Sequence, residues 1–376
     1  MTDPKKKTGL LKKLLVMGVA FIAFALLAEG LVVLFLGEQV KFPRHVVEAP
    51  WNLRYNQPGA HYRHKSPDVE IWFDINEQGM REDEDVAYEK APGRKRILSL
   101  GDSFTIGYEV SEEDCFSSVL ERELRDRGYD VEVLNCGVSG FSTAEEMLYL
   151  ERELFKYHPD LVLVSFYSND IRDNIRTGLF KLDPESDELV QLSERYVPMG
   201  RVANWLNRNP ILSWLSQHSN AFALLKNTAT AQLKDSRVQE NKEKLKEGYE
   251  AGEKKGNGEG YVPPEIPFAA KLCCALYERI YRDTQAQGIP LVIQSIPNPG
   301  IDRESGEGVL KNRFPIDCFD TERPGLAYLD GRDFLMPFFK KELLYWQRSN
   351  KHWTPFSHHA SGKALAELID ERGLLK

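Results

Sequence analysis

Residues 96–110 read RILSLGDSFTIGYEV, and this stretch decides the fold. An apolar run, Ile97–Leu100, leads through Gly101 to Asp102 and Ser103. A short apolar run that ends in glycine and polar residues is typical of a buried strand followed by a turn. The pattern therefore predicts a strand that delivers Ser103 to the turn at its carboxyl end.

The same alternation of apolar runs and helical patterns continues along the chain. Gly128 and Gly288 stand where two predicted helices stop, and Ser142-x-x-Glu145 has the form of a capping box. Apolar strands that alternate with helices indicate a parallel sheet covered by helices, so we predict an α/β sandwich. Its strands are expected at Ile97–Leu100, Val131–Leu134, Leu161–Phe166 and Leu291–Ser295, and its helices at Ser111–Arg127, Ser142–Tyr157, Phe268–Gln287 and Ser357–Glu371.

Three polar loops follow the first three predicted strands, and the carboxyl ends of parallel strands form the crevice where ligands bind. We therefore expect the loops to converge on one edge of the sheet. Ser103 would expose its hydroxyl there and use its own N–H to stabilise an oxyanion, while Gly137 and Asn169 would supply further donors. The loops are Gly101–Phe104 (GDSF), Asn135–Gly140 (NCGVSG) and Tyr167–Asp170 (YSND).

Acyl transfer to a serine also needs a general base. His352, in the sequence HWTP, directly precedes the last predicted helix. A histidine in a loop before the closing helix could reach Ser103 and take its proton. We expect His352 to have this role.

With these motifs the exported part of the chain resembles the SGNH/GDSL hydrolase family. The resemblance implies a three-layer α/β/α sandwich with a parallel sheet, with Ser103 as nucleophile and His352 as general base. It also implies that Gly137 and Asn169 join the Ser103 backbone in an oxyanion hole, with no metal or organic cofactor. The matching blocks are NEQGMRED at 76–83, the opening run at 96–110, VLNCGVSGFSTAEE at 133–146, FYSNDIRDN at 166–174 and KHWTPFSHHASGKALAE at 351–367.

The last block departs from the family pattern. Family members usually place an aspartate two or three residues before the histidine, but Asn350 and Ser349 occupy those positions, and a glycine common shortly after the histidine appears as Ser357. In serine proteases the corresponding Asp→Asn change lowers turnover by about 10⁴. Three interpretations remain open. A backbone carbonyl could orient His352 in a Ser-His dyad, an acid from elsewhere could replace the missing one, or the protein could be a catalytically impaired binder. The candidate acids are Asp330 and Asp333.

Other polar residues near these blocks favour structural roles. His358 and His359 lack carboxylate partners at metal-ligand spacing, so a helix-start or exposed role is the better interpretation. Asp170 is expected to be a structural hydrogen-bonder beside Asn169. Asp102 could cap its turn or orient the local backbone.

A long apolar segment, Leu14–Leu36, follows Lys12 and Lys13, and Glu29 is its only ionisable residue. As a helix it would be about 34 Å long, enough to cross a hydrocarbon core of about 30 Å. The lysines should stay cytoplasmic, which leaves the rest of the chain outside as a single-pass protein. A cleaved signal peptide with an A-x-A site at Ala23–Ala25 is the alternative. Glu29 is expected to be protonated or to reach the interface.

The charge and the composition of the chain limit the classes of molecule that it could bind. The 376-residue chain has a formal net charge of −8, with five lysines and one aspartate in residues 1–13. The rest of the chain therefore sums to −12, which argues against nucleic acid as a partner, because phosphate binding needs a cationic face. The five cysteines lack metal-ligand spacing, so a disulfide is possible but no framework can be predicted.

The alternation of predicted strands and helices is interrupted by one long segment, residues 177–265. We predict a cytoplasmic tail at 1–13, a transmembrane anchor at 14–36, a leader at 37–90 and an α/β hydrolase domain at 91–376 that contains an insertion at 177–265. We interpret the insertion as a helical cap followed by a charged linker over Lys234–Gly260. Its tryptophans, Trp205 and Trp214, could line a substrate entrance or touch the membrane surface, but packing of the cap on the sheet is the favoured interpretation.

Two hypotheses of function follow. The first is a membrane-anchored, periplasmic or extracellular serine esterase or acyltransferase that acts on an acylated glycan or a lipid ester. The second is an impaired carbohydrate- or lipid-binding protein of the same fold, which Asn350 motivates.

Overall fold

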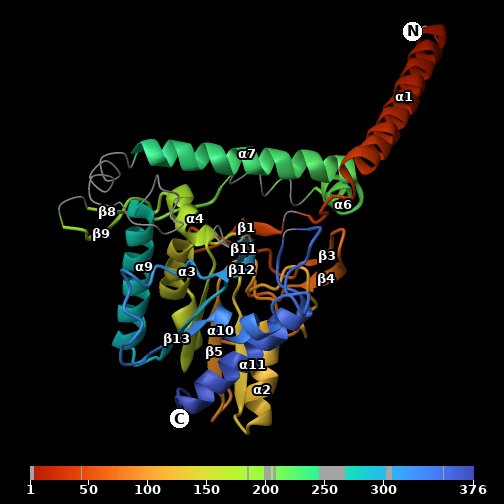
Figure 1. The fold of residues 1–376 in the computed structure, drawn as a ribbon. Coiled ribbons are helices and arrows are strands. Elements are labelled where there is room, and N and C mark those ends of the chain that lie inside the picture. Colours follow the sequence, from red (N-terminus) through yellow and green to blue (C-terminus); the bar gives the residue numbers. More distant parts are fainter. Residues whose placement is uncertain are drawn as a thin grey trace.

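The computed structural model describes residues 4–43, 45–183, 186–198, 205, 209–244, 267–301, 307–349 and 351–376. A five-stranded parallel sheet lies at its centre (Figure 1). The four strands predicted for this sheet are confirmed to within two residues at each end, and its last strand in chain order was not predicted. The strands are β5 (Lys95–Leu100), β6 (Val131–Asn135), β7 (Leu161–Phe166), β10 (Leu291–Ser295) and β13 (Leu326–Asp330).

The strand order across the sheet is β13-β10-β7-β5-β6. The first strand of this sheet in chain order, β5, thus lies between the second, β6, and the third, β7. This order reverses between β5 and β7, and ligands of open parallel sheets bind at such a switch point. The loops that carry Ser103 and Asn169 leave the sheet there.

Helices cover both faces of the sheet, as an α/β/α sandwich requires. On one face α2 packs on α11, and on the other α9 packs on α3 and α4. Each helix layer packs on the sheet through its own apolar cluster. The cluster beneath α2 and α11 contains Phe116 and Trp353, and the cluster beneath α3, α4 and α9 contains Met147 and Phe166. The helices are α2 (Phe116–Asp126), α3 (Thr143–Arg152), α4 (Asn169–Thr177), α9 (Pro267–Ala286) and α11 (Pro355–Glu371); a 3₁₀ turn, η1 (Leu154–Tyr157), follows α3, and a short α10 (Gly331–Leu335) with η2 (Met336–Phe338) follows β13.

The predicted helix signals are confirmed. Ser142 accepts a bond from the backbone of Glu145 while the Glu145 carboxylate accepts from the Ser142 backbone, which completes the capping box. Gly128 and Gly288 adopt φ angles of 93° and 69° just after α2 and α9, where a side chain would be strained. The start of α2 was predicted too early, because the residues before Phe116 form turns.

The leader, for which the sequence shows no clear pattern, consists of short antiparallel pairs. Leu53 is fully buried in the core and Trp51 stacks on Tyr149 of α3, so the leader packs against the sandwich. A further hairpin lies in each of two later connections. The paired strands are β1 (Val46–Glu48) with β2 (Arg54–Asn56), β3 (His61–Lys65) with β4 (Glu70–Asp74), β8 (Phe180–Leu182) with β9 (Leu189–Gln191), and β11 (Asn298–Ile301) with β12 (Gly308–Lys311).

That residues 177–265 form an inserted cap stays a prediction, but the segment does contain two helices, α6 (Pro210–His218) and α7 (Asn220–Lys244). Two expectations about it are wrong. The charged segment is still helical up to residue 244, and Trp205 and Trp214 are 63% and 58% exposed rather than packed on the sheet. The part of the predicted linker beyond residue 244 lies outside the described residues.

The apolar N-terminal segment forms one long helix, α1 (Pro4–Leu36), which projects away from the body in Figure 1. Its span Leu11–Leu36 has a mean hydropathy of 2.7 and is not buried in the structure, so by length and composition it could cross a membrane or serve as a signal sequence. We expected Glu29 to be protonated or to reach the membrane interface, and the structure gives it partners in the body of the protein. Its carboxylate accepts hydrogen bonds from Ser219 and from the backbone N–H groups of Asn220 and Ala221, and thereby caps the start of α7.

Candidate active site

Ser103 and His352, which lie 249 residues apart, meet at the carboxyl edge of the sheet. The Nε2 atom of His352 is 2.8 Å from the Oγ atom of Ser103. Ser103 stands in the turn after β5 and is half-buried, while His352 lies in the loop before α11. The ring of Phe104 packs edge-on against His352, with ring centroids 5.0 Å apart. A serine hydroxyl at this distance from an imidazole nitrogen can transfer its proton to it.

A buried carboxylate faces the other nitrogen of that imidazole. The Oε2 atom of Glu109 lies 3.4 Å from the Nδ1 atom of His352, and the Glu109 side chain is completely buried. The expected substitutes, Asp330 and Asp333, are not there. Asp330 caps α10 and bonds to Arg332 and Asn312, and Asp333 is exposed on the same helix. An acid from elsewhere in the chain is therefore present, but it is Glu109.

The segment before His352 supports this acid instead of supplying one. Ser349, at one of the positions where the family aspartate is usual, donates its hydroxyl to Glu109 Oε2 at 2.8 Å. The indole N–H of Trp346 donates to the Glu109 backbone oxygen at 3.1 Å. Asn350 lies outside the described residues.

Arg81, from the leader block NEQGMRED, holds the loop that carries Glu109. Its buried guanidinium donates to the backbone oxygens of Ile106, Gly107 and Val110 at 2.7, 2.6 and 2.8 Å. Glu109 itself has a φ of 68°, a left-handed conformation that is unfavourable for a residue with a side chain. The three charge-assisted bonds from Arg81 offset this cost and orient the carboxylate toward His352.

The surroundings of Glu109 favour its charged form. Burial alone would raise the pKa of the carboxyl group, but the contacts with His352 and His64 outweigh burial and hold the pKa below its usual range. His64 Nε2 lies 3.7 Å from Glu109 Oε1. Burial lowers the pKa of His64 despite the carboxylate beside it. We therefore expect an ionised Glu109 to face His352 at neutral pH.

Candidate donors for an oxyanion lie around Ser103. In the described part of the chain, no acceptor bonds to the Ser103 N–H. Asn169 Nδ2 donates to Asp102 Oδ2 at 3.0 Å and makes a longer contact of 3.4 Å with Asp173. The hydrogen bond to Asp102 fixes the orientation of the Asn169 side-chain amide. Because the contact with Asp173 is long, the second N–H of this amide makes only a weak hydrogen bond.

Gly137 has a different environment from the one we expected. Its N–H donates to Asn135 Oδ1 at 3.1 Å, so it would reach a substrate oxygen only by giving up or sharing that bond. A Cβ atom at this position would lie 2.3 Å from the backbone nitrogen of Ile106. Glycine is thus needed here for the close approach of the second loop to the loop that carries Glu109.

The neighbouring polar residues have structural partners. Asp102 accepts from the Phe104 N–H at 2.9 Å as well as from Asn169, so it both caps its turn and orients the amide. Burial raises the pKa of Asp102, against the effect of these two hydrogen bonds. Asp170 accepts from the Tyr167 N–H at 3.0 Å, in line with the structural role we expected.

The two histidines after His352 also have protein partners. His358 is buried and its Nδ1 accepts from the Phe116 N–H at 3.2 Å, while His359 contacts Asp114 at 2.7 Å. Among the described residues, no group of three His, Cys, Asp or Glu side chains is placed to hold a metal ion.

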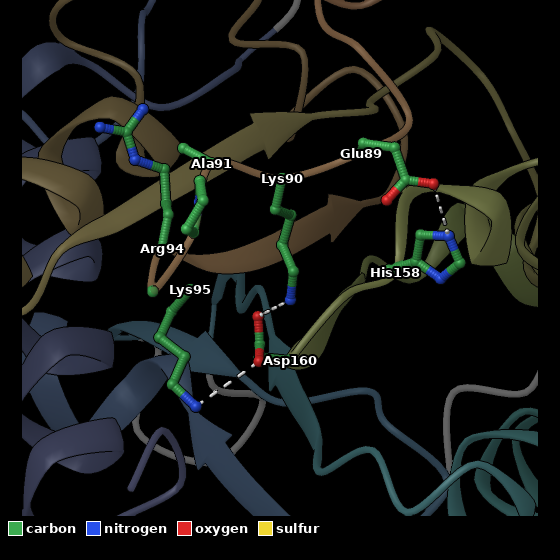
Figure 2. Close-up of a pocket in the computed structure, with 9 residues that line it drawn as sticks. Glu89, Lys90, Ala91, Arg94, Lys95, His158 and Asp160 are labelled. Atoms are coloured by element: carbon green, nitrogen blue, oxygen red, sulfur yellow. Dashed lines mark hydrogen bonds and ion pairs between the residues drawn. The ribbon is translucent and has the colours of Figure 1, made fainter.

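A hollow on a distant part of the surface contains none of these groups. Figure 2 shows Lys90 and Lys95 on either side of Asp160, which they both contact just before β7 begins. Since Lys95 is the first residue of β5 and Asp160 directly precedes β7, the hollow lies at the amino edge of the sheet, opposite Ser103. Its charged groups already have ionic partners on the protein, so we place the candidate site at the carboxyl edge.

Glu109 was missed although it lies in the stretch that opened the sequence analysis. It stands six residues after Ser103, between Tyr108 and Val110. A lone acid next to such apolar residues was the available signal, because a buried acid needs a partner.

Comparison with known proteins agrees with the fold. The model of the GDSL-like lipase/acylhydrolase family matches residues 99–308, which is more than half of the chain. An arylesterase of Vibrio mimicus is 37% identical over 76 residues, which cover 20% of this chain and 38% of the relative. The matched segment thus spans well under two thirds of that relative.

Two solved structures that match this chain are distant in sequence and have low TM-scores. A G-D-S-L family protein of Desulfitobacterium hafniense is 11% identical with a TM-score of 0.38, over 73% of this chain and 99% of that one. A catalytic mutant of an acetylxylan esterase from Geobacillus stearothermophilus is 12% identical with a TM-score of 0.38, over 73% and 94%.

Proposed function

The chain belongs to the GDSL-like lipase/acylhydrolase family, and from that premise we propose that it hydrolyses carboxylic esters through an acyl-serine intermediate on Ser103. The observation that carries the proposal is the array Ser103–His352–Glu109, with contacts of 2.8 and 3.4 Å. A nucleophile, a base and a group that orients the base are the parts that covalent acyl transfer requires.

The reaction begins with proton transfer from Ser103 Oγ to His352 Nε2 as the oxygen attacks the ester carbon. The carbonyl oxygen becomes negative, and the Ser103 N–H and the Asn169 amide donate to it. Glu109 stabilises the positive charge that develops on His352. His352 then protonates the departing alcohol, and the acyl group stays on Ser103.

The second half repeats these steps with water as nucleophile. His352 takes a proton from the water, which attacks the acyl-serine, and returns the proton to Ser103 Oγ as the acid leaves. An alcohol in place of water would give acyl transfer by the same route.

The alternative hypothesis, a catalytically impaired binding protein, is no longer needed to explain the departure from the family pattern. It depended on the missing aspartate near His352, and Glu109 supports the enzymatic alternative by supplying a carboxylate at the required nitrogen. We therefore do not propose it as a second function.

We also propose that the body is exported and held at a membrane by α1. The exposed apolar span of α1 supports anchoring, and the disulfide between Cys274 and Cys318 supports an oxidising compartment. Figure 1 shows α7 crossing the body between the base of α1 and α4, whose first residue is Asn169. This arrangement places the carboxyl edge of the sheet on the same side as α1, where ester groups at a membrane surface are within reach.

The test uses the full chain in a neutral detergent. We expect a fluorophosphonate probe to label the protein and p-nitrophenyl esters to be hydrolysed, and we expect both activities to disappear in Ser103→Ala. Ser168→Ala is the matched control, because Ser168 is a half-buried serine at the same edge whose side chain makes no cap bond. A wild-type protein as inert as Ser103→Ala would refute the proposal.

A further inference from the structure

A second cavity lies beside the proposed catalytic residues, and none of the roles described so far involves it. It has a volume of about 260 Å³ and lies between α7, the leader around Phe42–Val47 and the segment at 196–198. We call it the α7 pocket. Five cationic side chains line it and none of its described lining residues is acidic; the cations are Arg54, Arg176, Lys226, Lys234 and Arg237.

Three of these cations converge on one point. A Cβ atom built on Gly140 would lie 3.7 Å from Lys234 Nζ and 3.9 Å from an Nη1 atom of both Arg54 and Arg176. Gly140 ends the loop that begins at Asn135 and has a φ of 69°, which favours glycine. Since like charges repel, three cationic groups around one backbone position need anionic partners.

The protein supplies only part of that charge. Glu145 pairs with Arg54 at 2.7 Å and lies 3.7 Å from Arg176, and Asp173 lies 3.4 Å from Arg176. The Nε atom of Arg176 has no partner among the described residues, although the side chain is only 2% exposed. No ion pair joins Lys234 to a carboxylate in the described part of the chain. Within the described part of the chain, Arg54 and Arg176 thus have carboxylate partners whereas Lys234 and Arg237 have none, so this side of the pocket keeps a positive surplus.

Lys234 is an exposed residue of α7 whose ammonium group lies close to two other cations. Desolvation by the neighbouring protein groups, and then the positive charge of Arg176, lower the pKa of the Lys234 ammonium group. The negative charge of Asp173 acts in the opposite direction. A ligand with a negative charge would stabilise the ammonium form at this position.

The α7 pocket shares a wall with the proposed active site. Tyr108 lines the pocket, and its ring lies 5.5 Å from the ring of His352, centroid to centroid. Ser139, two residues after Gly137, also lines the pocket and is half-buried at the carboxyl edge. A substrate bound at Ser103 can thus place a second group in the pocket.

We propose that the α7 pocket binds an anionic group, a carboxylate or a phosphate, that is carried by the ester substrate. The inference rests on the proposed ester hydrolysis and narrows its substrate class to anionic esters. Two sources share this chemistry: the uronate of an acylated acidic glycan, and the phosphate of an acyl lipid. Apolar wall residues such as Val46 and Leu233 accept the uncharged part of either one.

The test compares two matched pairs of esters with the full chain in neutral detergent. One pair is an acetylated methyl galacturonate and the corresponding acetylated methyl galactoside, and the other is 1-acylglycerol 3-phosphate and 1-acylglycerol. We expect kcat/KM for the anionic member of at least one pair to exceed that for the neutral member by about tenfold or more, as a charge-assisted hydrogen bond allows. The responding pair identifies the source.

Charge-removing variants locate the effect. Lys234→Gln, and separately Arg237→Gln, should lower that anionic-to-neutral ratio about tenfold. Lys363→Gln on α11 is the control, since it removes the same charge from an exposed residue that does not line the pocket, and it should not change the ratio. A ratio near one for both pairs, or a ratio that neither pocket variant changes, would overturn the inference.

A binding arm separates this inference from the proposed function. Ser103→Ala is titrated with methyl galacturonate and with glycerol 3-phosphate by calorimetry. If Ser103→Ala binds either anion and the double variant Ser103→Ala, Lys234→Gln does not, the result supports anion binding in the α7 pocket even if no ester is hydrolysed. If esters are hydrolysed at Ser103 but neither anion binds and no pair shows a preference, the pocket inference fails and the proposed function stands.

Discussion

The carboxylate of Glu109 is the part of the proposed triad that a single substitution tests most directly. Glu109→Gln keeps the shape of the side chain and its hydrogen bond from Ser349, but removes the negative charge that faces His352. We expect it to lower kcat for p-nitrophenyl esters strongly while KM changes little, because the charge matters only when His352 becomes a cation.

The magnitude follows from the geometry. Glu109 Oε2 and His352 Nδ1 are 3.4 Å apart, and the carboxylate is completely buried. At an effective dielectric constant of about 20, unit charges at that separation attract by about 5 kcal/mol. Since about 1.4 kcal/mol corresponds to a factor of ten in rate, loss of the charge should lower kcat by about 10³ to 10⁴-fold. This agrees with the effect of about 10⁴ for Asp→Asn in serine proteases.

The assay combines steady-state kinetics with the rate of fluorophosphonate labelling. Both readouts should fall together, since each requires Ser103 to lose its proton to His352. Glu109→Asp is the matched control, because it keeps the charge but shortens the side chain, and its activity should lie between the other two. Thermal unfolding of each variant reports whether the fold persists.

A folded Glu109→Gln protein with kcat within tenfold of wild type would refute this reasoning. It would mean that a group other than Glu109 orients His352, and a Ser-His dyad with a backbone carbonyl would then become the better model.

Three further predictions concern residues around this array. Asn350→Asp should change kcat by less than about threefold, because Glu109 already supplies a carboxylate; a large gain in steady-state rate would contradict that role. Arg81→Lys keeps the charge but loses the fork that binds three carbonyls, so kcat should fall about tenfold or more with little change in KM, and an unchanged kcat would show that the Glu109 loop holds its shape without it. Burial, and then the charges of Asp102 and Glu145, raise the pKa of Glu146, and neither of its carboxyl oxygens has a hydrogen-bond partner in the described part of the structure. The folded state therefore keeps a proton that the unfolded state loses above about pH 4.5, and wild-type stability falls by up to about 1.4 kcal/mol per pH unit above that value. Glu146→Gln cannot titrate, so its gain in unfolding free energy over wild type should be larger at pH 8 than at pH 5 in urea titrations; an equal difference at both values would refute the prediction.

The local pattern of the sequence determined most of the sandwich. Apolar runs such as Leu161–Phe166 became strands because they are buried on both faces, and Ser142 and Gly288 marked helix ends through backbone chemistry that acts within a few residues. The same locality placed Ser103 at the carboxyl end of β5. The leader hairpins were not predictable in this way, since residues such as Leu53 are ordered by packing against the body.

Only the tertiary structure decided which acid faces His352 and where the cations gather. Glu109 follows Ser103 by six residues, yet its carboxylate reaches a histidine 243 residues away because Arg81, from the leader, holds its loop in a strained conformation. Lys234 meets Gly140 because α7 crosses above the second loop, and Glu29 of α1 caps the first turn of that helix. Contacts of this kind join segments far apart in the chain, and no periodicity or spacing in the sequence encodes them. The sequence thus specified the sheet and the edge where Ser103 lies, and the long-range packing determined the electrostatics at that edge.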